Sequence, residues 1–399
     1  MKYNSIKIEN TNIVCFLLFL IIFIFPSPII NHFLFPGSYL SILAATICVI
    51  LLARSNYHIG FFTTIISLAL LIYCIFLAVI IQNTIVISLM LGLPLTLIIY
   101  SLLGDKINHI LNGLIDAATI FFTLGTICII LSLIYAYFGG KELFIIENPD
   151  GRFASFYLSS LSNSKLGDII RPSFIYDEPG AYSFYLSFIA LSRVYLNKNK
   201  WVTLILLYGS LVTFSLTHLI ICILFTIKLL NKKQLLVLLG PLIFIFVSLL
   251  ASFQDELGFF INRLNTDSVH ENNRTVQLEN FKRSIDRNEN ILLYGNLDCL
   301  NRVNSRCIED GDISSSPATP IYRLGALGLI IQLSFFMFSI WNFRQKNCLF
   351  IAIILNLLLL QRPFYTSIYY SFSIFILIYC LFNSKLNLTS KNKNPEKNE

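Results

Sequence analysis

Apolar runs of about 20 residues recur along this chain and limit what it can fold into more than any other feature. An α-helix needs roughly 20 mostly apolar residues to cross the hydrocarbon core of a bilayer, and the runs 59–81, 84–103 and 114–138 have about that length. Only 13% of the residues are charged, against 56% hydrophobic, so a soluble fold would lack the polar side chains to cover its surface. The sequence therefore predicts an all-α integral membrane protein.

These runs predict about twelve transmembrane helices and two large polar loops. The expected regions are N-terminal helices (1–138), a first loop (139–179), central helices (180–253), a second loop (254–320), C-terminal helices (321–384) and a cytoplasmic tail (385–399). The expected spans are about 13–31, 38–53, 59–81, 84–103, 114–138, 181–196, 201–216, 218–230, 235–253, 322–342, 347–361 and 364–382. One stretch stays open: 201–230 forms either one long span or two short ones that turn between Ser215 and His218.

The distribution of charge favours twelve spans with the N-terminus in the cytoplasm. In that arrangement 16 of the 29 Lys and Arg and 5 of the 22 Asp and Glu lie inside, which leaves 13 basic and 17 acidic residues outside. The net charge is then +11 inside and −4 outside, as the positive-inside rule requires. Both large loops are therefore expected outside. The overall charge of +7 reflects this topology and not nucleic-acid binding.

Most of the cysteines indicate packing and not chemistry. Cys299 and Cys307 lie in the second loop, close enough in sequence for a disulfide in an oxidising compartment. No Cys-x-x-Cys pair or His-rich spacing indicates a metal site, and no glycine loop for a nucleotide is present, so no metal or cofactor is expected. The other cysteines lie in apolar runs and are interpreted as small buried hydrophobic residues: Cys15, Cys48, Cys74, Cys128, Cys222, Cys348 and Cys380.

The end of the first loop brings an arginine and two carboxylates to the start of an apolar run. This stretch reads Arg171-Pro172-Ser173-Phe174-Ile175-Tyr176-Asp177-Glu178-Pro179-Gly180. One interpretation is a loop-to-helix junction in which the two acidic residues complement the positive end of the helix dipole. The other is a functional site at the boundary between lipid and water.

The second loop contains the spacing of an amphipathic helix. Leu278, Phe281 and Ile285 recur at intervals of three and four residues after Asn272-Asn273-Arg274, and Ile291-Leu292 continue the pattern. Leu293-Tyr294-Gly295-Asn296 is expected to end it. Arg274 would lie in the first turn, where the helix dipole disfavours a cation. That position indicates either an anionic ligand or a solvated arginine. Lys282, Arg283 and Arg287 are interpreted as a solvated face.

A third arginine, Arg323, follows the second loop at the start of an apolar run. It is either a side chain that reaches back to the membrane interface or a ligand-binding group. Arg171, Arg274 and Arg323 would thus border the outer leaflet together with Asp177 and Glu178. Arginine binds phosphate through a planar, permanently charged fork, so a lipid diphosphate is the expected ligand. Glu178 or Asp177 would then act as general base on a sugar hydroxyl.

Three motifs in this order resemble the O-antigen polymerase (Wzy-type) family, within the wider O-antigen polymerase/ligase superfamily. The motifs are Arg171 with Glu178-Pro179-Gly180, Asn273-Arg274 with Gly295-Asn296, and Arg323-Leu324-Gly325-Ala326-Leu327-Gly328. The resemblance implies a membrane-embedded glycosyltransferase of the GT-C-like kind in the bacterial inner membrane, with its active site facing the periplasm.

The resemblance also implies the reaction and the partners. A growing glycan would move from undecaprenyl diphosphate onto an incoming lipid-linked oligosaccharide repeat unit, among membrane lipids and with a chain-length regulator protein. Arg171 and Arg274 would hold diphosphates, and Glu178 would lie beside the acceptor.

Two alternatives remain open. An O-antigen ligase would carry a His-Asn pair just before the span that follows the large loop, where this chain has Ser316-Pro317 and Pro320. A lipid-linked oligosaccharide flippase or transporter would place charged residues within its spans. Here the spans are almost free of ionisable residues, and the two considered are Asp116, near a cytoplasmic end, and His218, at the expected turn.

Overall fold

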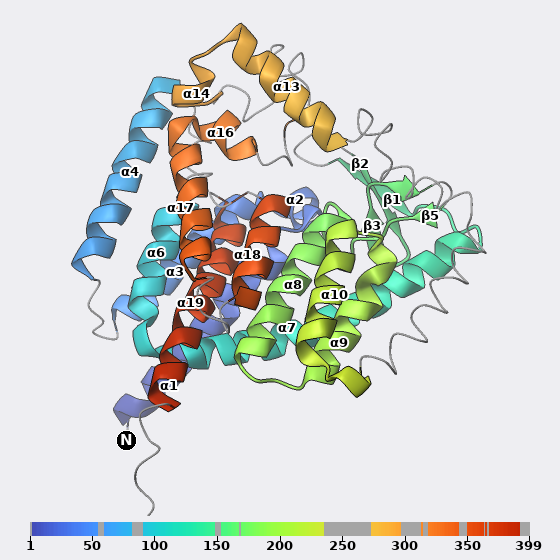
Figure 1. Ribbon diagram of the computed structural model, residues 1–399, viewed down its shortest axis with the longest axis horizontal. Coiled ribbons are helices and arrows are strands. Elements are labelled where there is room, and N and C mark those ends of the chain that lie inside the picture. The colour runs from blue at the N-terminus through green and yellow to red at the C-terminus, as the bar shows by residue number, and fades with distance from the viewer. Residues whose placement is uncertain are drawn as a thin grey trace, which may run out of the picture.

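The computed structural model describes the chain in eleven segments, and within them the protein is mostly helical (Figure 1). Helices make up most of the molecule; the helices of the second loop, within 273–294, lie at the top of the view, and the strands of the first loop lie at its right-hand side. The described residues are 2–54, 60–81, 91–147, 153–166, 169–234, 273–296, 313, 318–342, 349–362, 364 and 367–391. The expected span 235–253 lies outside them.

The N-terminal helices follow the predicted apolar runs, with one early break. The elements are α1 (Lys2–Phe19), the π-helical turn η1 (Leu20–Ile24), α2 (Pro28–Phe33), α3 (Gly37–Ala53), α4 (Phe61–Ile81) and α6 (Gly92–Leu103). The first run was expected to continue to about residue 31. It breaks after η1 because Pro26 lacks an amide hydrogen and its ring clashes with the preceding turn. Pro28 then begins the separate helix α2.

Helix α7 (Ile107–Tyr137) is long and apolar enough to cross a membrane, judged by its length and composition. It was expected to begin near residue 114 and begins about two turns earlier, after the 3-10 turn η2 (Gly104–Lys106). Ile107, Ile110 and Leu111 extend its buried face and explain the difference. The other apolar helical stretches of the described residues are shorter, with lengths of 10–17 residues.

The first loop contains strands, which the all-α prediction did not include. Strands β1 (Phe144–Glu147), β2 (Phe153–Tyr157) and β3 (Ser160–Ser162) form one antiparallel sheet, and β4 (Lys165–Leu166) and β5 (Ile169–Ile170) form another. Ile146, Ala154 and Leu161 point into one small core, against which Ile29 of α2 packs. The strands form because this loop must bury apolar side chains while pairing its backbone groups.

The open stretch 201–230 forms two helices that pack against each other. Helix α8 (Pro179–Tyr195) precedes it, and α9 (Lys200–Gly209), the 3-10 turn η3 (Ser210–Thr213) and α10 (Leu216–Leu229) make it up. The helix ends where Phe214 adopts a left-handed conformation, with φ of 51°. The reversal thus lies at the edge of the predicted turn.

The C-terminal part is divided by another break. Its elements are α13 (Asn273–Arg287), α14 (Ile291–Tyr294), α16 (Thr319–Leu324), α17 (Ala326–Asn342), α18 (Leu349–Gln361) and α19 (Ile368–Lys391). A single helix was expected over 322–342, but Gly325 interrupts it with φ of 57°. Only glycine adopts this backbone conformation readily, so the interruption is local to that residue.

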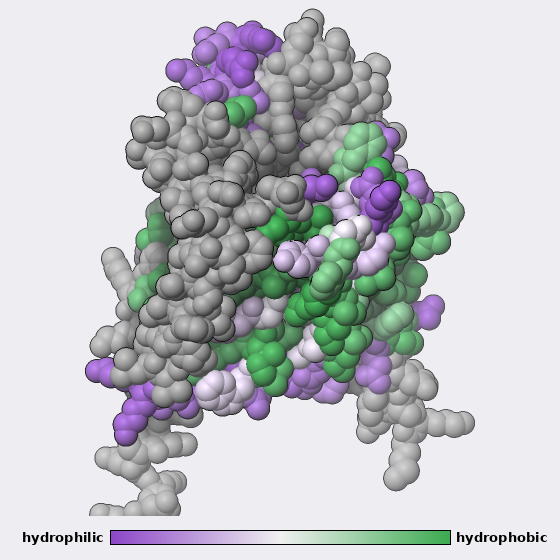
Figure 2. Space-filling view, turned by 90° about the vertical axis from the view of Figure 1, so that its right-hand side faces the viewer, coloured by the Kyte–Doolittle hydropathy of each residue, from purple (hydrophilic) through white to green (hydrophobic). Residues whose placement is uncertain are grey.

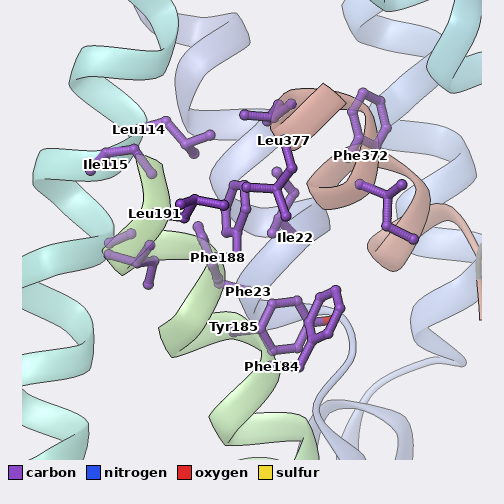
Figure 3. Close-up of a cluster of buried hydrophobic side chains, with 14 of the residues drawn as sticks. Ile22, Phe23, Leu114, Ile115, Phe184, Tyr185, Phe188, Leu191, Phe372 and Leu377 are labelled. Atoms are coloured by element: carbon purple, nitrogen blue, oxygen red, sulfur yellow. The ribbon is translucent and has the colours of Figure 1, made fainter. Parts of the chain in front are cut away.

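The core of the helical part gathers around Phe23 of η1 (Figure 3). Its ring lies 5.5 Å from that of Phe122 on α7, and 5.8 Å and 6.1 Å from those of Tyr185 and Phe188 on α8. Leu377 of α19 closes the same cluster. Three helical elements, η1, α7 and α19, thus fix the start of α8, which follows the Asp177-Glu178 pair directly.

Many large apolar side chains remain exposed on the outside of the helices. On α4, Phe61 and Phe62 are 74% and 79% exposed, and Ile120 on α7 is 65% exposed. Figure 2 shows apolar side chains over the middle of one face, with hydrophilic side chains along its lower edge and at its top. Such a surface is unfavourable in water and agrees with a helical membrane protein.

Candidate functional site

The stretch 171–180 is held rigidly by buried hydrogen bonds. The Ser173 hydroxyl lies 2.7 Å from the carbonyl of Tyr176 and 3.0 Å from that of Leu161, so it bridges the stretch to β3. The Tyr176 hydroxyl donates to the carbonyl of Phe23 over 3.0 Å. Burial raises the pKa of Tyr176 well above its ordinary value, so the phenol keeps the proton that this bond needs. The carboxylates that follow therefore start from a fixed backbone.

Glu178 forms an ion pair with Arg362, which lies just after α18. Glu178 occupies the N-cap position of α8, yet its side chain makes no capping hydrogen bond to that helix. The side chains of Arg362 and Glu178 are only 5% and 21% exposed. In such a setting the loss of one partner leaves an uncompensated charge and costs about 3–5 kcal/mol. The interpretation of Glu178 as a mere complement to the helix dipole does not account for this pairing.

Gly180 makes room for this ion pair. A β-carbon at residue 180 would lie 3.0 Å from a guanidinium nitrogen of Arg362 and 3.5 Å from the amide nitrogen of Gln361. The Gln361 amide donates to the Gly180 carbonyl over 3.3 Å. The glycine of the Glu-Pro-Gly motif is thus explained by close approach of the segment between α18 and α19.

Arg323 reaches the same place from the end of the second loop. Its guanidinium carbon lies 5.5 Å from the centre of the Phe364 ring, and that of Arg362 lies 5.7 Å from the same centre. Both distances lie within the range of cation–π attraction. Glu178, Arg323, Arg362 and Phe364 together are called the Phe364 cluster below. It joins three segments that are far apart in the sequence.

A row of aromatic rings supports this cluster from the core. The rings of Phe364 and Tyr370 are 5.5 Å apart, those of Tyr370 and Tyr185 5.6 Å, and those of Tyr185 and Tyr176 4.9 Å. Asp177 lies close enough to Tyr185 and Tyr370 to act on both phenols electrostatically. The three tyrosines are buried, so they position the cluster and do not offer a surface to a sugar.

The second and third motifs of the sequence are in direct backbone contact. The Asn296 amide donates to the Tyr322 carbonyl over 2.6 Å, and its side-chain amide donates to the Tyr322 hydroxyl over 3.0 Å. Gly295 and Gly325 lie so close that a β-carbon at 325 would be 2.6 Å from the Gly295 nitrogen. Hydrogen bonds and close backbone packing therefore fix the end of the short helix α14 against α16, the helix that carries Arg323.

Arg171 lies at a different point of the structure. Its guanidinium donates to the carbonyl of Phe214 over 3.0 Å, at the reversal between α9 and α10. Of the residues expected in one site, the structure brings Arg323 and Glu178 to the Phe364 cluster. The backbone of Arg274 lies in the first turn of α13, as predicted, but its side chain lies outside the described residues, as do Cys299 and Cys307.

Helix α13 confirms the first part of the predicted helix, but it ends at Arg287, and Ile291 and Leu292 belong to the separate helix α14. The side of the helix that is buried carries Gln277, Asn280 and Ser284, whereas Leu278 is 47% exposed. Phe281 still packs toward the protein, with its ring 6.4 Å from that of Tyr322. The apolar stripe and the buried stripe therefore overlap only in part. Lys282, Arg283 and Arg287 are exposed, as the solvated-face interpretation predicts.

Ionisable groups within the helices have structural partners. Asp116 of α7 forms a 2.8 Å ion pair with Lys198. A ring nitrogen of His218 lies 2.8 Å from the carbonyl of Leu207 in a fully buried position. Arg193, which the sequence analysis did not single out, donates to Thr203 and Thr119. These contacts connect neighbouring helices in the series α7, α8, α9 and α10.

Arg362 and Phe364 are the members of the cluster that sequence reasoning missed. A signal was present, because Gln361-Arg362-Pro363-Phe364 interrupts two apolar runs with a charge. In the twelve-span arrangement this short turn lies outside, where the positive-inside rule disfavours arginine. An arginine that departs from this rule at an outer turn is a candidate for a specific partner.

Comparisons of the chain with protein-family models, with curated proteins and with solved structures found no match. In the described part of the chain, no group of three or more His, Cys, Asp or Glu could hold a metal ion. Four of the cysteines expected in the core, Cys48, Cys74, Cys222 and Cys380, are buried and free, and Cys15 and Cys128 are free and half-buried.

Proposed function

We propose that this chain is a twelve-span glycosyltransferase of the bacterial inner membrane that polymerises lipid-linked repeat units, as O-antigen polymerases do. The observation that carries the proposal is the Phe364 cluster. Glu178 ends the first loop and Arg323 follows the second, and both meet at the segment between α18 and α19. A carboxylate and two arginines at one point are the groups that transfer from a lipid diphosphate needs.

A membrane location is supported by the surface of the helices. Apolar side chains on α4 and α7 are exposed where a soluble protein would carry polar ones. Trp201, near the start of α9, and Trp341, near the end of α17, are also exposed. Tryptophan is enriched at both interfaces of a bilayer, so the two residues fit the ends of spans.

The proposed reaction exchanges one bond to the anomeric carbon for another. The acceptor hydroxyl of the incoming repeat unit attacks C1 of the sugar at the reducing end of the growing glycan. The bond from C1 to the diphosphate oxygen breaks, a glycosidic bond from C1 to the hydroxyl oxygen forms, and undecaprenyl diphosphate leaves with the electron pair. Glu178 takes the hydroxyl proton, and Asp177 is the alternative base.

The arginines would stabilise the charge that develops on the leaving diphosphate. Arg323 would take this role at the Phe364 ring, which Arg362, the partner of Glu178, also contacts. Arg171 and Arg274 are assigned to diphosphates on the resemblance of their motifs. The interlock of Gly295 and Gly325 supports this assignment indirectly, because it ties the segment that follows α13 to the helix that carries Arg323.

The test is the glycan made by bacterial cells that lack the protein. Loss of a polymerase should leave lipid A-core capped with a single repeat unit, and expression of the intact chain should restore the ladder of longer glycans. Uncapped lipid A-core would contradict the proposal and indicate a ligase or a flippase. Normal ladders in the deletion strain would exclude all three functions.

A further inference from the structure

We propose that Arg323 and Arg362, which both contact the Phe364 ring, form a diphosphate subsite that Glu178 occupies as an internal anion until substrate binds. The inference rests on the proposed function for the identity of the ligand. It adds Arg362 as an anion-binding residue and gives Glu178 a second task, which is to hold Arg362 in place before the ligand arrives.

The first argument is the concentration of positive charge around one ring. The distances of 5.5 Å and 5.7 Å to the Phe364 centre place the two guanidinium carbons within 11.2 Å of each other, the sum of the two. Two cations at this separation in a partly buried place repel each other. An anion with two charged groups can contact both guanidinium groups at once, and a diphosphate is such an anion.

The second argument is the shape of the surroundings. Arg362 is almost fully buried, and Gly180 and Gln361 confine its guanidinium on the side of α8. The side chain is therefore held in place before any ligand arrives. A preorganised arginine loses less conformational entropy on binding an anion. A solvated arginine at a short turn would need no such confinement.

The third argument concerns Glu178. Its carboxylate is engaged by Arg362, and a carboxylate held by a cation is a weaker base toward a hydroxyl. When a diphosphate takes over Arg362, Glu178 is released at the moment when a base is required. Asp177 is the other carboxylate nearby, and it lies toward Tyr185 and Tyr370. The geometry thus couples occupation of the subsite to availability of the base.

The experiment measures binding of undecaprenyl diphosphate to the full-length protein in nanodiscs of phosphatidylethanolamine and phosphatidylglycerol. Arg362→Gln should weaken binding at least tenfold, about 1.4 kcal/mol. Glu178→Gln should tighten it about tenfold, because the competing carboxylate is gone. Arg283→Ala, an exposed arginine on α13, is the matched control and should bind as the unmodified chain does.

A second probe identifies the group that is recognised. Inorganic pyrophosphate should displace the lipid from the unmodified protein and should do so far less well from Arg362→Gln. If pyrophosphate does not compete, the assignment of the subsite to a diphosphate is wrong. The phosphatidylglycerol of the nanodisc is present in every sample, so binding to a general anionic surface cannot produce the difference.

A third variant protects the test against misfolding. Glu178→Gln/Arg362→Gln removes both charges, so neither is left buried alone, and it should bind as weakly as Arg362→Gln. Thermal unfolding of each variant reports on the fold separately. A purely structural ion pair predicts lower Tm for both single variants, recovery in the double variant and no tightening in Glu178→Gln. That result would overturn the inference.

The outcomes also separate this inference from the proposed function. If the variants change binding as expected but the unmodified protein makes no polymer, the subsite stands and the polymerase proposal falls. If the unmodified protein makes polymer and Arg362→Gln binds undecaprenyl diphosphate normally, the function stands and the subsite falls.

Discussion

Replacement of Gly325 by alanine tests whether the contact between α14 and α16 positions Arg323. Gly325 has φ of 57° and ψ of −135°, and a β-carbon there would lie 2.4 Å from the carbonyl of Leu293. The added methyl group must therefore push α14 away. Gly104 is a matched control, since its φ of 45° and ψ of −130° are nearly the same and no atom lies within 4 Å of its β-carbon position.

The expected free-energy cost of each substitution follows from its backbone strain and from the contacts that would be lost. Both variants force alanine into a backbone region that costs about 1–3 kcal/mol. Gly325→Ala also separates Asn296 from Tyr322 and breaks two hydrogen bonds, each with a net contribution of about 0.5–1.5 kcal/mol. The excess cost in Gly325→Ala is then about 2 kcal/mol, which corresponds to about 30-fold in the equilibrium for local opening.

Hydrogen exchange measured by mass spectrometry resolves this difference. The peptide 288–296 should exchange about 30-fold faster in Gly325→Ala, because the Asn296 amide loses its acceptor, and at the unchanged rate in Gly104→Ala. Polymer formation should fall only in Gly325→Ala. Equal exchange of this peptide in both variants would show that α14 does not depend on the glycine contact, and the argument for positioning Arg323 would fail.

Three further predictions concern the other parts of the proposed site. Arg171→Lys and Arg274→Lys should reduce the amount of polymer nearly as much as the alanine variants do, because a lysine lacks the bidentate fork of arginine. The control Arg283→Ala should keep normal ladders. Full activity of either lysine variant would show that this arginine does not bind a diphosphate through its fork. Reporter fusions after residues 165 and 290 should report the outside and one after 232 the inside, and opposite sides for the two loops would contradict the twelve-span arrangement. Cys299 and Cys307 should resist thiol labelling before reduction, since a disulfide between them would contribute about 2–3 kcal/mol, and free labelling of both would exclude the bond.

The Phe364 cluster also changes how the Glu178→Gln variant should be interpreted. Loss of polymer in that variant has two sources, because the substitution removes both a base and the partner of Arg362. Tighter binding of undecaprenyl diphosphate together with loss of polymer is the combination that the subsite predicts. Loss of polymer with unchanged binding would assign Glu178 to proton transfer alone, and normal polymer would leave it as a helix-start residue.

The sequence by itself determined the elements whose causes are local. The apolar runs place most helices, Pro26 and Gly325 explain where two expected helices break, and the spacing of Leu278, Phe281 and Ile285 predicts α13. These outcomes depend on residues within one or two helical turns of each other, where backbone conformation and side-chain spacing are decided.

Tertiary structure alone decided which of the singled-out residues meet. Glu178 lies beside Arg362 because α8 packs against α18 and α19, and nothing near either residue in the sequence specifies the other. The same holds for Arg323 and Phe364, and for the strands of the first loop, whose apolar side chains are buried where α2 and α7 pack against them. Tertiary structure also decided the partner of Arg171, whose guanidinium donates to the carbonyl of Phe214, where the chain reverses between α9 and α10. Local patterns identify charged residues at the ends of helices, but the packing of helices distant in sequence decides which of those ends coincide.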